Sequence, residues 1–89
     1  MVREMKLRDL KVKLLLLVNQ LPESTPREYE LKRMLTMRTN TLRNFTLSNY
    51  LQTLMLINYE NNVSSTFKEN IKKMIEEIQK YIEGGRDKW

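Results

Sequence analysis

A stretch in the middle of the chain combines positive charge with many short polar side chains. Residues 31–59 contain four basic residues and no acidic one, and Thr, Asn, Ser and Gln are dense among them. Lys and Arg attract phosphate whatever the base sequence, and short amide and hydroxyl side chains can bond phosphate oxygens or base edges. This pattern predicts contact with a nucleic acid. A pair of polar, solvated helices is the other explanation of the same pattern.

The net charge of +5 is concentrated in this stretch. Residues 1–30 carry six basic and five acidic side chains, and residues 60–89 carry six of each. Clustering of this kind is evidence about an anionic partner rather than about the fold. Double-stranded DNA is the partner that we expect, and an acidic protein surface is the alternative.

The residue types that many enzymes need are missing from the chain. It has no cysteine and no histidine, so a disulfide framework, a zinc site and a thiol nucleophile are excluded. Ser64 and Ser65 have no histidine to activate them, and the carboxylates of Glu76 and Glu77 are expected on a solvated helical face. Both glycines lie near the C-terminal end, which leaves no glycine-rich phosphate loop. We therefore expect a protein that is not an enzyme and that uses no cofactor or metal.

Two helices are expected in the first part of the chain. A leucine stripe with spacings of three and four residues predicts a helix over residues 6–20, which Pro22 prevents from continuing. Thr25 and Pro26 mark a second start, because threonine can cap a helix and proline fits its first position. Glu28 would complete a capping box by bonding back to the Thr25 N–H. This predicts a second helix over residues 26–37.

A third helix is predicted over residues 40–57, with Thr39 as the best N-cap candidate. Its apolar residues fall on two roughly opposite faces. One face is marked by Leu42 and Phe45, and the other by Leu47, Tyr50, Leu51 and Leu54. One uninterrupted helix would need cover on both sides.

Two arrangements are compatible with this pattern. In the first, the helix begins near Asn40 and presents Arg43, Asn44 and Ser48 to DNA. In the second, residues 38–45 form a long turn or a short helical turn, and a helix that begins near residue 46 presents Thr46, Ser48, Asn49 and Gln52. The spacing of the apolar residues up to Leu42 favours the first arrangement.

The remaining segments are a connection, a long helix and a tail. Residues 58–65 can form either a very short β-hairpin or a polar loop. A last helix is predicted over residues 67–83, capped by Thr66 and ended by Gly84 and Gly85. Its apolar residues recur at spacings of four and three, as in a heptad seam. Residues 84–89 are expected to be a tail.

The inward positions of the second and third segments have a characteristic spacing. They are occupied by Leu31, Leu35, Met37 and the pair Thr41-Leu42. Over about residues 25–60 the chain thereby resembles the broad helix-turn-helix and winged-helix class of DNA-binding proteins. It departs from that class at Thr36, where a turn glycine is common, and at Asn49, where an apolar anchor is usual. The resemblance implies an all-α domain, or a mainly α domain with a very short hairpin wing, whose recognition helix enters the major groove.

The seam of the last helix has two explanations. It can pack across the first helix within one chain, or it can pair with a second copy. A chain of 89 residues buries a modest core, and a two-fold dimer would set two recognition helices about 34 Å apart. We therefore expect a homodimer through a long C-terminal dimerisation helix. The predicted interface residues are Leu7, Leu10, Leu14, Ile71, Met74, Ile78, Tyr81 and Ile82.

The function expected from these patterns is that of a homodimeric, sequence-specific regulator of transcription. Its predicted DNA-binding residues are Lys32, Arg33, Arg38, Thr39, Asn40, Thr41, Arg43, Asn44 and Ser48. The alternatives are a DNA-coating nucleoid or plasmid-partition adaptor, a helical protein-interaction module without nucleic-acid binding, and an RNA-binding subunit. The apolar run over residues 14–18 is far shorter than the roughly 20 residues of a membrane-spanning helix. A cytoplasmic, nucleoid-associated location is therefore expected.

Overall fold

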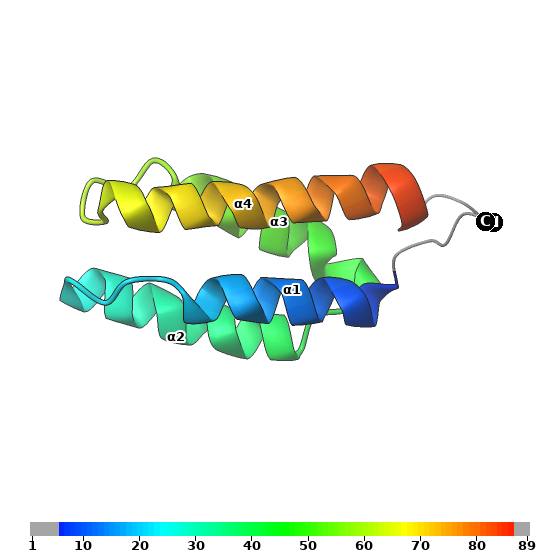
Figure 1. The fold of residues 1–89 in the computed structure, drawn as a ribbon, viewed down its shortest axis with the longest axis horizontal. Coiled ribbons are helices and arrows are strands. Elements are labelled where there is room, and N and C mark those ends of the chain that lie inside the picture. The colour runs from blue at the N-terminus through cyan, green and yellow to red at the C-terminus, as the bar shows by residue number, and fades with distance from the viewer. Residues whose placement is uncertain (1–5, 87–89) are drawn as a thin grey trace.

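The computed structural model describes residues 6–86. Four α-helices and two short helical turns make up this part of the chain, which contains no β-strand. The all-α class predicted from the periodic segments is therefore confirmed. The helices run alternately up and down a bundle with extents of 44 × 21 × 20 Å (Figure 1). None of the helices in residues 6–86 combines the length and the apolar character that crossing a membrane would require.

The first two helices are α1 (Leu7–Asn19) and α2 (Pro26–Asn40). α2 begins at the predicted proline, and the Oγ1 atom of Thr25 accepts a hydrogen bond of 3.1 Å from the Glu28 N–H. It ends three residues later than the predicted residue 37. Two contacts hold this additional turn: the Thr39 side chain is bonded inside the bundle, and Lys11 Nζ donates to the Asn40 carbonyl at 3.0 Å.

Glu28 does not close the capping box predicted for it. Its carboxylate is buried and instead accepts hydrogen bonds of 2.7 Å from the backbone N–H groups of Ser24 and Ser64. These two serines belong to different loops, one before α2 and one before the last helix. A single buried side chain therefore ties together the two loops at one end of the bundle.

The third helix, α3 (Leu47–Ile57), begins later than predicted and follows a 3₁₀ turn, η1 (Asn44–Thr46). The favoured arrangement, a single helix from Asn40, is therefore wrong. The helix begins near residue 46 as in the second arrangement, although residues 38–40 belong to α2 and not to the turn. Leu42 and Leu47 are both buried, yet positions five apart on one helix point about 140° away from each other. The break between α2 and α3 allows both leucines to face the same core.

The segment after α3 is a turn and not a β-hairpin. The N–H groups of Tyr59 and Glu60 bond back to the carbonyls of Leu56 and Ile57, each at 3.0 Å, so of the two alternatives for this segment the loop is observed and the hairpin wing is not. The last helix, α4 (Ser65–Tyr81), is capped by Ser64 instead of Thr66. A π-helical turn, η2 (Ile82–Arg86), continues past the predicted end at residue 83, so residues 84–86 of the predicted tail are helical. Residues 87–89 of that tail lie outside the described residues.

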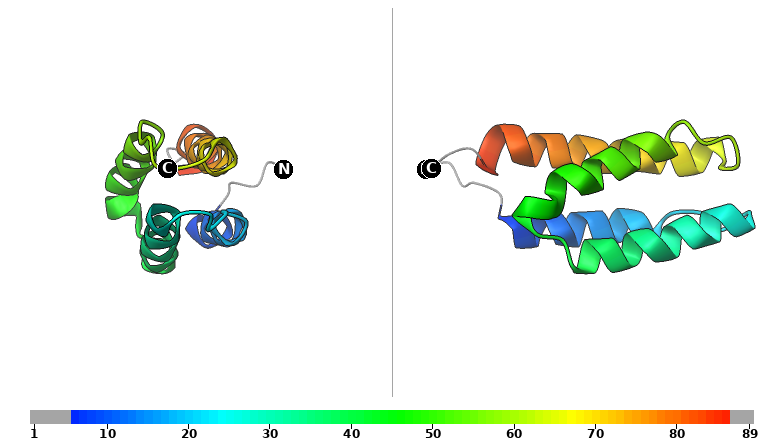
Figure 2. Two further views of the ribbon diagram at one scale, coloured as in Figure 1. Left: turned by 90° about the vertical axis from the view of Figure 1, so that its left-hand side faces the viewer. Right: turned by 180° about the vertical axis from the view of Figure 1, so that it is seen from behind.

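The helices are arranged so that α1 packs against both α2 and α4, and α3 packs against α4. α1 and α4 run antiparallel along the long axis, as Figure 1 shows. α3 is inclined to the other three helices and crosses the bundle from η1 towards the start of α4 (Figure 2). The C-terminal half of α2 and the N-terminal half of α3 therefore flank one side of the molecule.

The heptad-like seam of α4 is part of the core of the monomer. Ile71, Met74, Ile78 and Tyr81 are buried, together with Leu10 and Leu14 of α1. Leu7 and Ile82, the other two residues predicted at a dimer interface, are half-buried against the same core. The six buried side chains already pack within one chain, so in this structure they offer no surface to a second copy.

Candidate nucleic-acid interface

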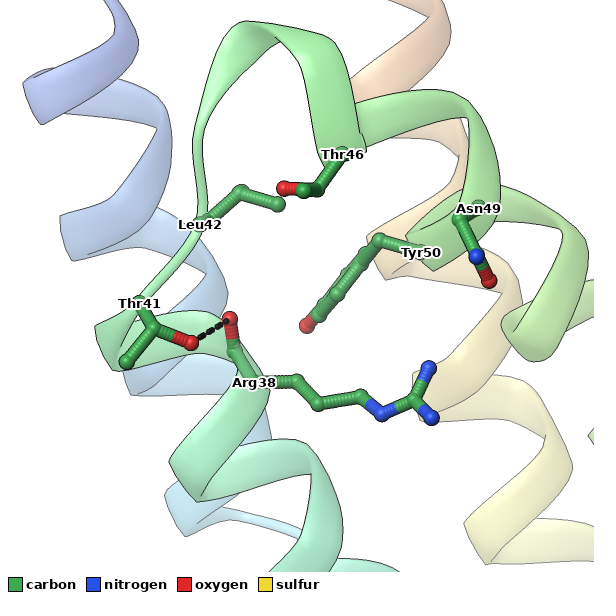
Figure 3. Close-up of a pocket in the computed structure, with 6 residues that line it drawn as sticks. All are labelled: Arg38, Thr41, Leu42, Thr46, Asn49 and Tyr50. Carbon is green, nitrogen blue, oxygen red and sulfur yellow. Dashed lines mark hydrogen bonds between the residues drawn. The ribbon is translucent and has the colours of Figure 1, made fainter.

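A shallow depression of about 200 Å³ lies between the end of α2 and the start of α3. Its lining residues are Arg38, Thr41, Leu42, Thr46, Asn49 and Tyr50 (Figure 3). Leu42 and Tyr50 are buried and form its floor, whereas Arg38, Thr41 and Asn49 are exposed at its rim. The depression therefore has an apolar base and a polar edge that carries one guanidinium group.

Arg38 reaches across from α2 to α3. Its Nη1 atom donates a hydrogen bond of 3.1 Å to Thr53 Oγ1, and Thr53 in turn donates to the Asn49 carbonyl at 3.0 Å. A hydroxyl acceptor leaves the guanidinium charge uncompensated and satisfies one of its five N–H donors. The remaining donors are therefore held at the rim, free for an anion.

The floor is fixed by a buried pair of hydroxyl groups. Thr39 Oγ1 donates to the Leu35 carbonyl at 2.6 Å and lies 2.6 Å from the Tyr50 hydroxyl. Because threonine has one hydroxyl proton, the Tyr50 hydroxyl must be the donor to Thr39. Burial raises the pKa of Tyr50 to about 12, so the phenol keeps this proton at neutral pH. Thr39 is thus a buried link between α2 and α3, and the prediction that it contacts phosphate is wrong.

The other predicted contact residues near the depression are exposed. Asn40 and Thr41 end α2, and the Thr41 hydroxyl donates back to the Met37 carbonyl at 3.1 Å. Asn44, in η1, accepts a hydrogen bond of 2.6 Å at Oδ1 from the Tyr81 hydroxyl, which leaves its amide N–H₂ as the available group. Ser48 lies on the outer side of α3. These side chains are therefore exposed around the break between α2 and α3.

The four basic side chains of the stretch differ in their partners. Lys32 is paired with Glu23, with Nζ and Oε2 3.0 Å apart. Arg33 lies over the ring of Tyr29, 5.9 Å from its centroid. Within residues 6–84, Arg33, Arg38 and Arg43 form no ion pair, whereas Lys13, Arg27, Lys32 and Lys80 do. The uncompensated positive charge is therefore carried by three arginines of α2 and the following turn.

Sequence reasoning missed parts of this site that depend on pairing between helices. Tyr50 and Thr53 bond to residues of α2, and their roles depend on how α3 is inclined. Lys11 was outside the predicted site, yet its ammonium group reaches the C-terminal end of α2. Asn49 belongs to the arrangement that was not favoured. Its position two residues after the start of α3 is the signal that places it at the rim.

The candidate site therefore joins the Arg38 guanidinium to a rim of hydroxyl and amide groups, with Arg43 in the turn between α2 and η1. The described residues contain no cluster of three or more Asp, Glu, Cys or His side chains that could hold a metal ion. Comparison with known proteins finds no family model that matches the chain, and no curated protein or solved structure with significant similarity to it.

Proposed function

We propose that the protein binds double-stranded DNA in a sequence-specific way through the face formed by the second half of α2, η1 and the first half of α3. The observation that carries this proposal is Arg38, which forms no ion pair within the described residues and lies at the rim of the depression between α2 and α3. A regulator of transcription that occupies operator DNA is the role that fits such a face. In this proposal α3 acts as the recognition helix, as the second helix of a helix-turn-helix protein does.

The depression suits a phosphate group better than a larger ligand. Its volume of about 200 Å³ is below the roughly 300–1,000 Å³ of small-molecule pockets. Arginine binds phosphate through paired N–H donors, and Arg38 is already oriented by Thr53. Arg38 and Arg43 are therefore assigned to phosphates on either side of the groove that α3 enters.

The first half of α3 supplies the side chains for base recognition. Ser48, Asn49 and Gln52 are exposed and uncharged, and they lie between the assigned phosphate contacts and the middle of the helix. Asn and Gln can bond adenine at two atoms in the major groove, which discriminates between bases by about 1–3 kcal/mol. A helix of 11 residues is about 16 Å long, enough to lie in one major groove. The proposal therefore assigns base recognition to α3 and not to Asn40 and Thr41, which the sequence pattern predicted.

The test is binding of purified protein to random duplex DNA across a salt series. We expect log affinity to fall with log salt, and Arg38→Ala and Arg43→Ala each to reduce the slope by about 0.9. Lys72→Ala is the matched control, because it also removes one positive charge but lies exposed on α4. Lys32→Ala should have little effect, since Glu23 already compensates that charge.

Base reading is tested separately by selecting the bound sequences. Asn49→Ala and Gln52→Ala should broaden the selected set and leave the salt slope unchanged. Absence of binding at about 50 mM salt would disprove the DNA proposal. Long protected tracts without a preferred sequence would support a DNA-coating role instead. Stronger binding to RNA than to DNA of the same sequence would favour the RNA alternative.

A protein-interaction role is the second candidate, and one observation favours it. Phe45, Leu56 and Tyr59 are large apolar or aromatic residues on the surface, with 85%, 65% and 83% of their area exposed. Exposed side chains of this size on one helix and its flanking turns are common at protein interfaces.

A further inference from the structure

Phe45 is the most exposed large apolar side chain in the described part of the chain, with 85% of its area accessible to water. It lies in η1, between Leu42 and Leu47, which are buried and anchor this segment to the core on both sides. Removing an aromatic ring of this size from water is favourable. A partner that covers Phe45 would therefore gain affinity from it.

The backbone that carries Phe45 is held by hydrogen bonds on both sides of it. Thr46 Oγ1 accepts from the Arg43 N–H at 3.0 Å, and the Thr46 N–H donates to the Arg43 carbonyl at 3.1 Å. The Asn44 side chain is bonded to α4 through the Tyr81 hydroxyl, which donates to Oδ1 at 2.6 Å. Because the turn is already fixed, binding through Phe45 costs little backbone entropy.

Phe45 lies on the same side of the helix axis as the side chains proposed for base recognition. η1 continues directly into α3, because residues 46 and 47 both have helical backbone angles. Residues 45, 48, 49 and 52 are three, four and seven positions apart, a spacing that places side chains on one helical face. The buried residues of the opposite face are Leu47, Tyr50 and Leu54. Phe45 therefore extends the row of proposed base contacts towards the start of α3.

The charges around this turn favour an anionic partner. Arg43, two residues before Phe45, forms no ion pair within residues 6–84, and residues 31–59 contain no acidic side chain. Arg38 lies at the rim of the depression that Thr46 also lines (Figure 3). A nucleic-acid groove offers base edges between two rows of phosphates, which suits an apolar ring with arginines nearby. A purely apolar protein surface would gain nothing from these arginines.

The major groove presents one apolar substituent to such a ring, the 5-methyl group of thymine. The other base groups that distinguish the pairs there are hydrogen-bond donors and acceptors, which a phenyl ring cannot bond. We propose that Phe45 contacts the 5-methyl group of one thymine and thereby selects that base in the bound sequence. The inference rests on the proposed function and deepens it, because it names a base that the face recognises and the side chain that recognises it.

The test replaces thymine by uracil, which pairs with adenine in the same way and lacks only the 5-methyl group. A site selected from random duplex DNA is synthesised with uracil at one thymine position at a time, and the dissociation constant is measured at fixed salt. At one position uracil should weaken binding of the wild-type chain about 4-fold, the effect of one buried methyl-sized group. Phe45→Ala should bind the thymine and uracil sites equally at that position, with an unchanged salt slope because no charge is removed.

Tyr59→Ala is the matched control. Tyr59 is 83% exposed against 85% for Phe45, and it lies beyond the other end of α3. This variant should keep the difference between thymine and uracil. Phe45→Leu retains an apolar side chain and should keep part of that difference. Both positions lie on the surface, so no core residue is changed, and circular dichroism verifies that each variant is folded.

Three results would overturn the inference and leave the DNA proposal standing. One is sequence-dependent binding that no replacement of thymine by uracil changes. Another is a Phe45→Ala variant that still distinguishes thymine from uracil as the wild-type chain does. The third is a selected site with cytosine at this position and tighter binding after its 5-methylation, which would assign the contact to 5-methylcytosine. A wild-type chain that binds no duplex DNA at about 50 mM salt would instead disprove both proposals.

Discussion

The buried carboxylate of Glu28 bonds two loops, although the sequence pattern predicts that Glu28 caps α2. Desolvation of its buried carboxylate opposes ionisation, but hydrogen bonds from Ser64 and Ser24 outweigh it and lower the pKa of Glu28. The charged form is therefore stabilised in the folded protein. The carboxylate contributes stability above the unfolded pKa of about 4.3, and this contribution is lost as the pH falls through the lower folded pKa.

Glu28→Gln should lower the free energy of unfolding by about 2–3 kcal/mol at pH 7, because one backbone N–H loses its acceptor and a charge-assisted bond is lost. Urea unfolding measures the difference, and the gap from wild type should narrow below about pH 4. Glu30→Gln, on the same helix but exposed, is the control and should change stability little. A gap that stays constant with pH would show that the charge of Glu28 is not involved.

The hydroxyl pair between α2 and α3 gives a second prediction. Tyr50→Phe should cost about 1 kcal/mol, because one hydrogen bond is removed and Thr39 keeps its bond to the Leu35 carbonyl. Thr39→Val should cost more, roughly 1–3 kcal/mol, because it leaves the buried phenol without an acceptor. Urea unfolding of both variants and of the double variant measures the coupling. If the two single effects simply added, the pair would not be a direct link.

At the scale of the elements, α2 and α4 each begin where a side chain accepts a hydrogen bond from the backbone. The serine before α4 accepts a hydrogen bond of 3.2 Å from the Phe67 N–H and acts as the N-cap. Thr66, which the sequence pattern favoured, lies inside the helix. The chain offers two adjacent serines here, and one of them is the cap.

Ser64→Ala should therefore destabilise the protein by about 1 kcal/mol, the usual cost of removing an N-cap hydroxyl. Ser65→Ala replaces the neighbouring exposed serine at the first helical position and should be nearly neutral. Thermal unfolding of the two variants under identical conditions compares them. Equal losses would mean that α4 does not begin where the structure has it.

α3 is the element that serves most purposes in the proposed function. Its inner side packs on α4, its first half faces the rim of the depression, and its second half exposes Met55 and Leu56. These eleven residues carry no charge, and the two halves of the outer side lie at different points along the helix axis.

At the scale of the whole molecule, the buried residues of the α4 seam are part of the core of the monomer. Ile78→Val should lower the free energy of unfolding by about 0.5–1.5 kcal/mol, since Ile78 is fully buried. It should leave the dissociation constant between copies unchanged under native conditions. Gln79→Ala, at an exposed position of the same helix, is the control. An effect of Ile78→Val on association would return the interface to α4.

The sequence by itself determined the class of the fold and most of the helical segments. Periodic leucines, Pro22 and the Thr25-Pro26 start act locally, so α1 and the beginning of α2 follow from residues that are close in sequence. The excess of basic residues in the stretch 31–59 was likewise visible without coordinates. Local patterns are readable because their physics lies within one or two helical turns.

The tertiary structure alone decided where α3 begins, which polar groups are buried and which apolar side chains are left exposed. Phe45 was expected on a packed face but is exposed, whereas Thr39 was expected on DNA but lies under Tyr50. These outcomes depend on partners far away in sequence, since Leu42 and Leu47 must reach one core and Glu28 must meet a loop 36 residues later. The sequence also leaves open whether α4 packs on its own chain or on a second copy, because a regular apolar seam has the same pattern whichever surface covers it.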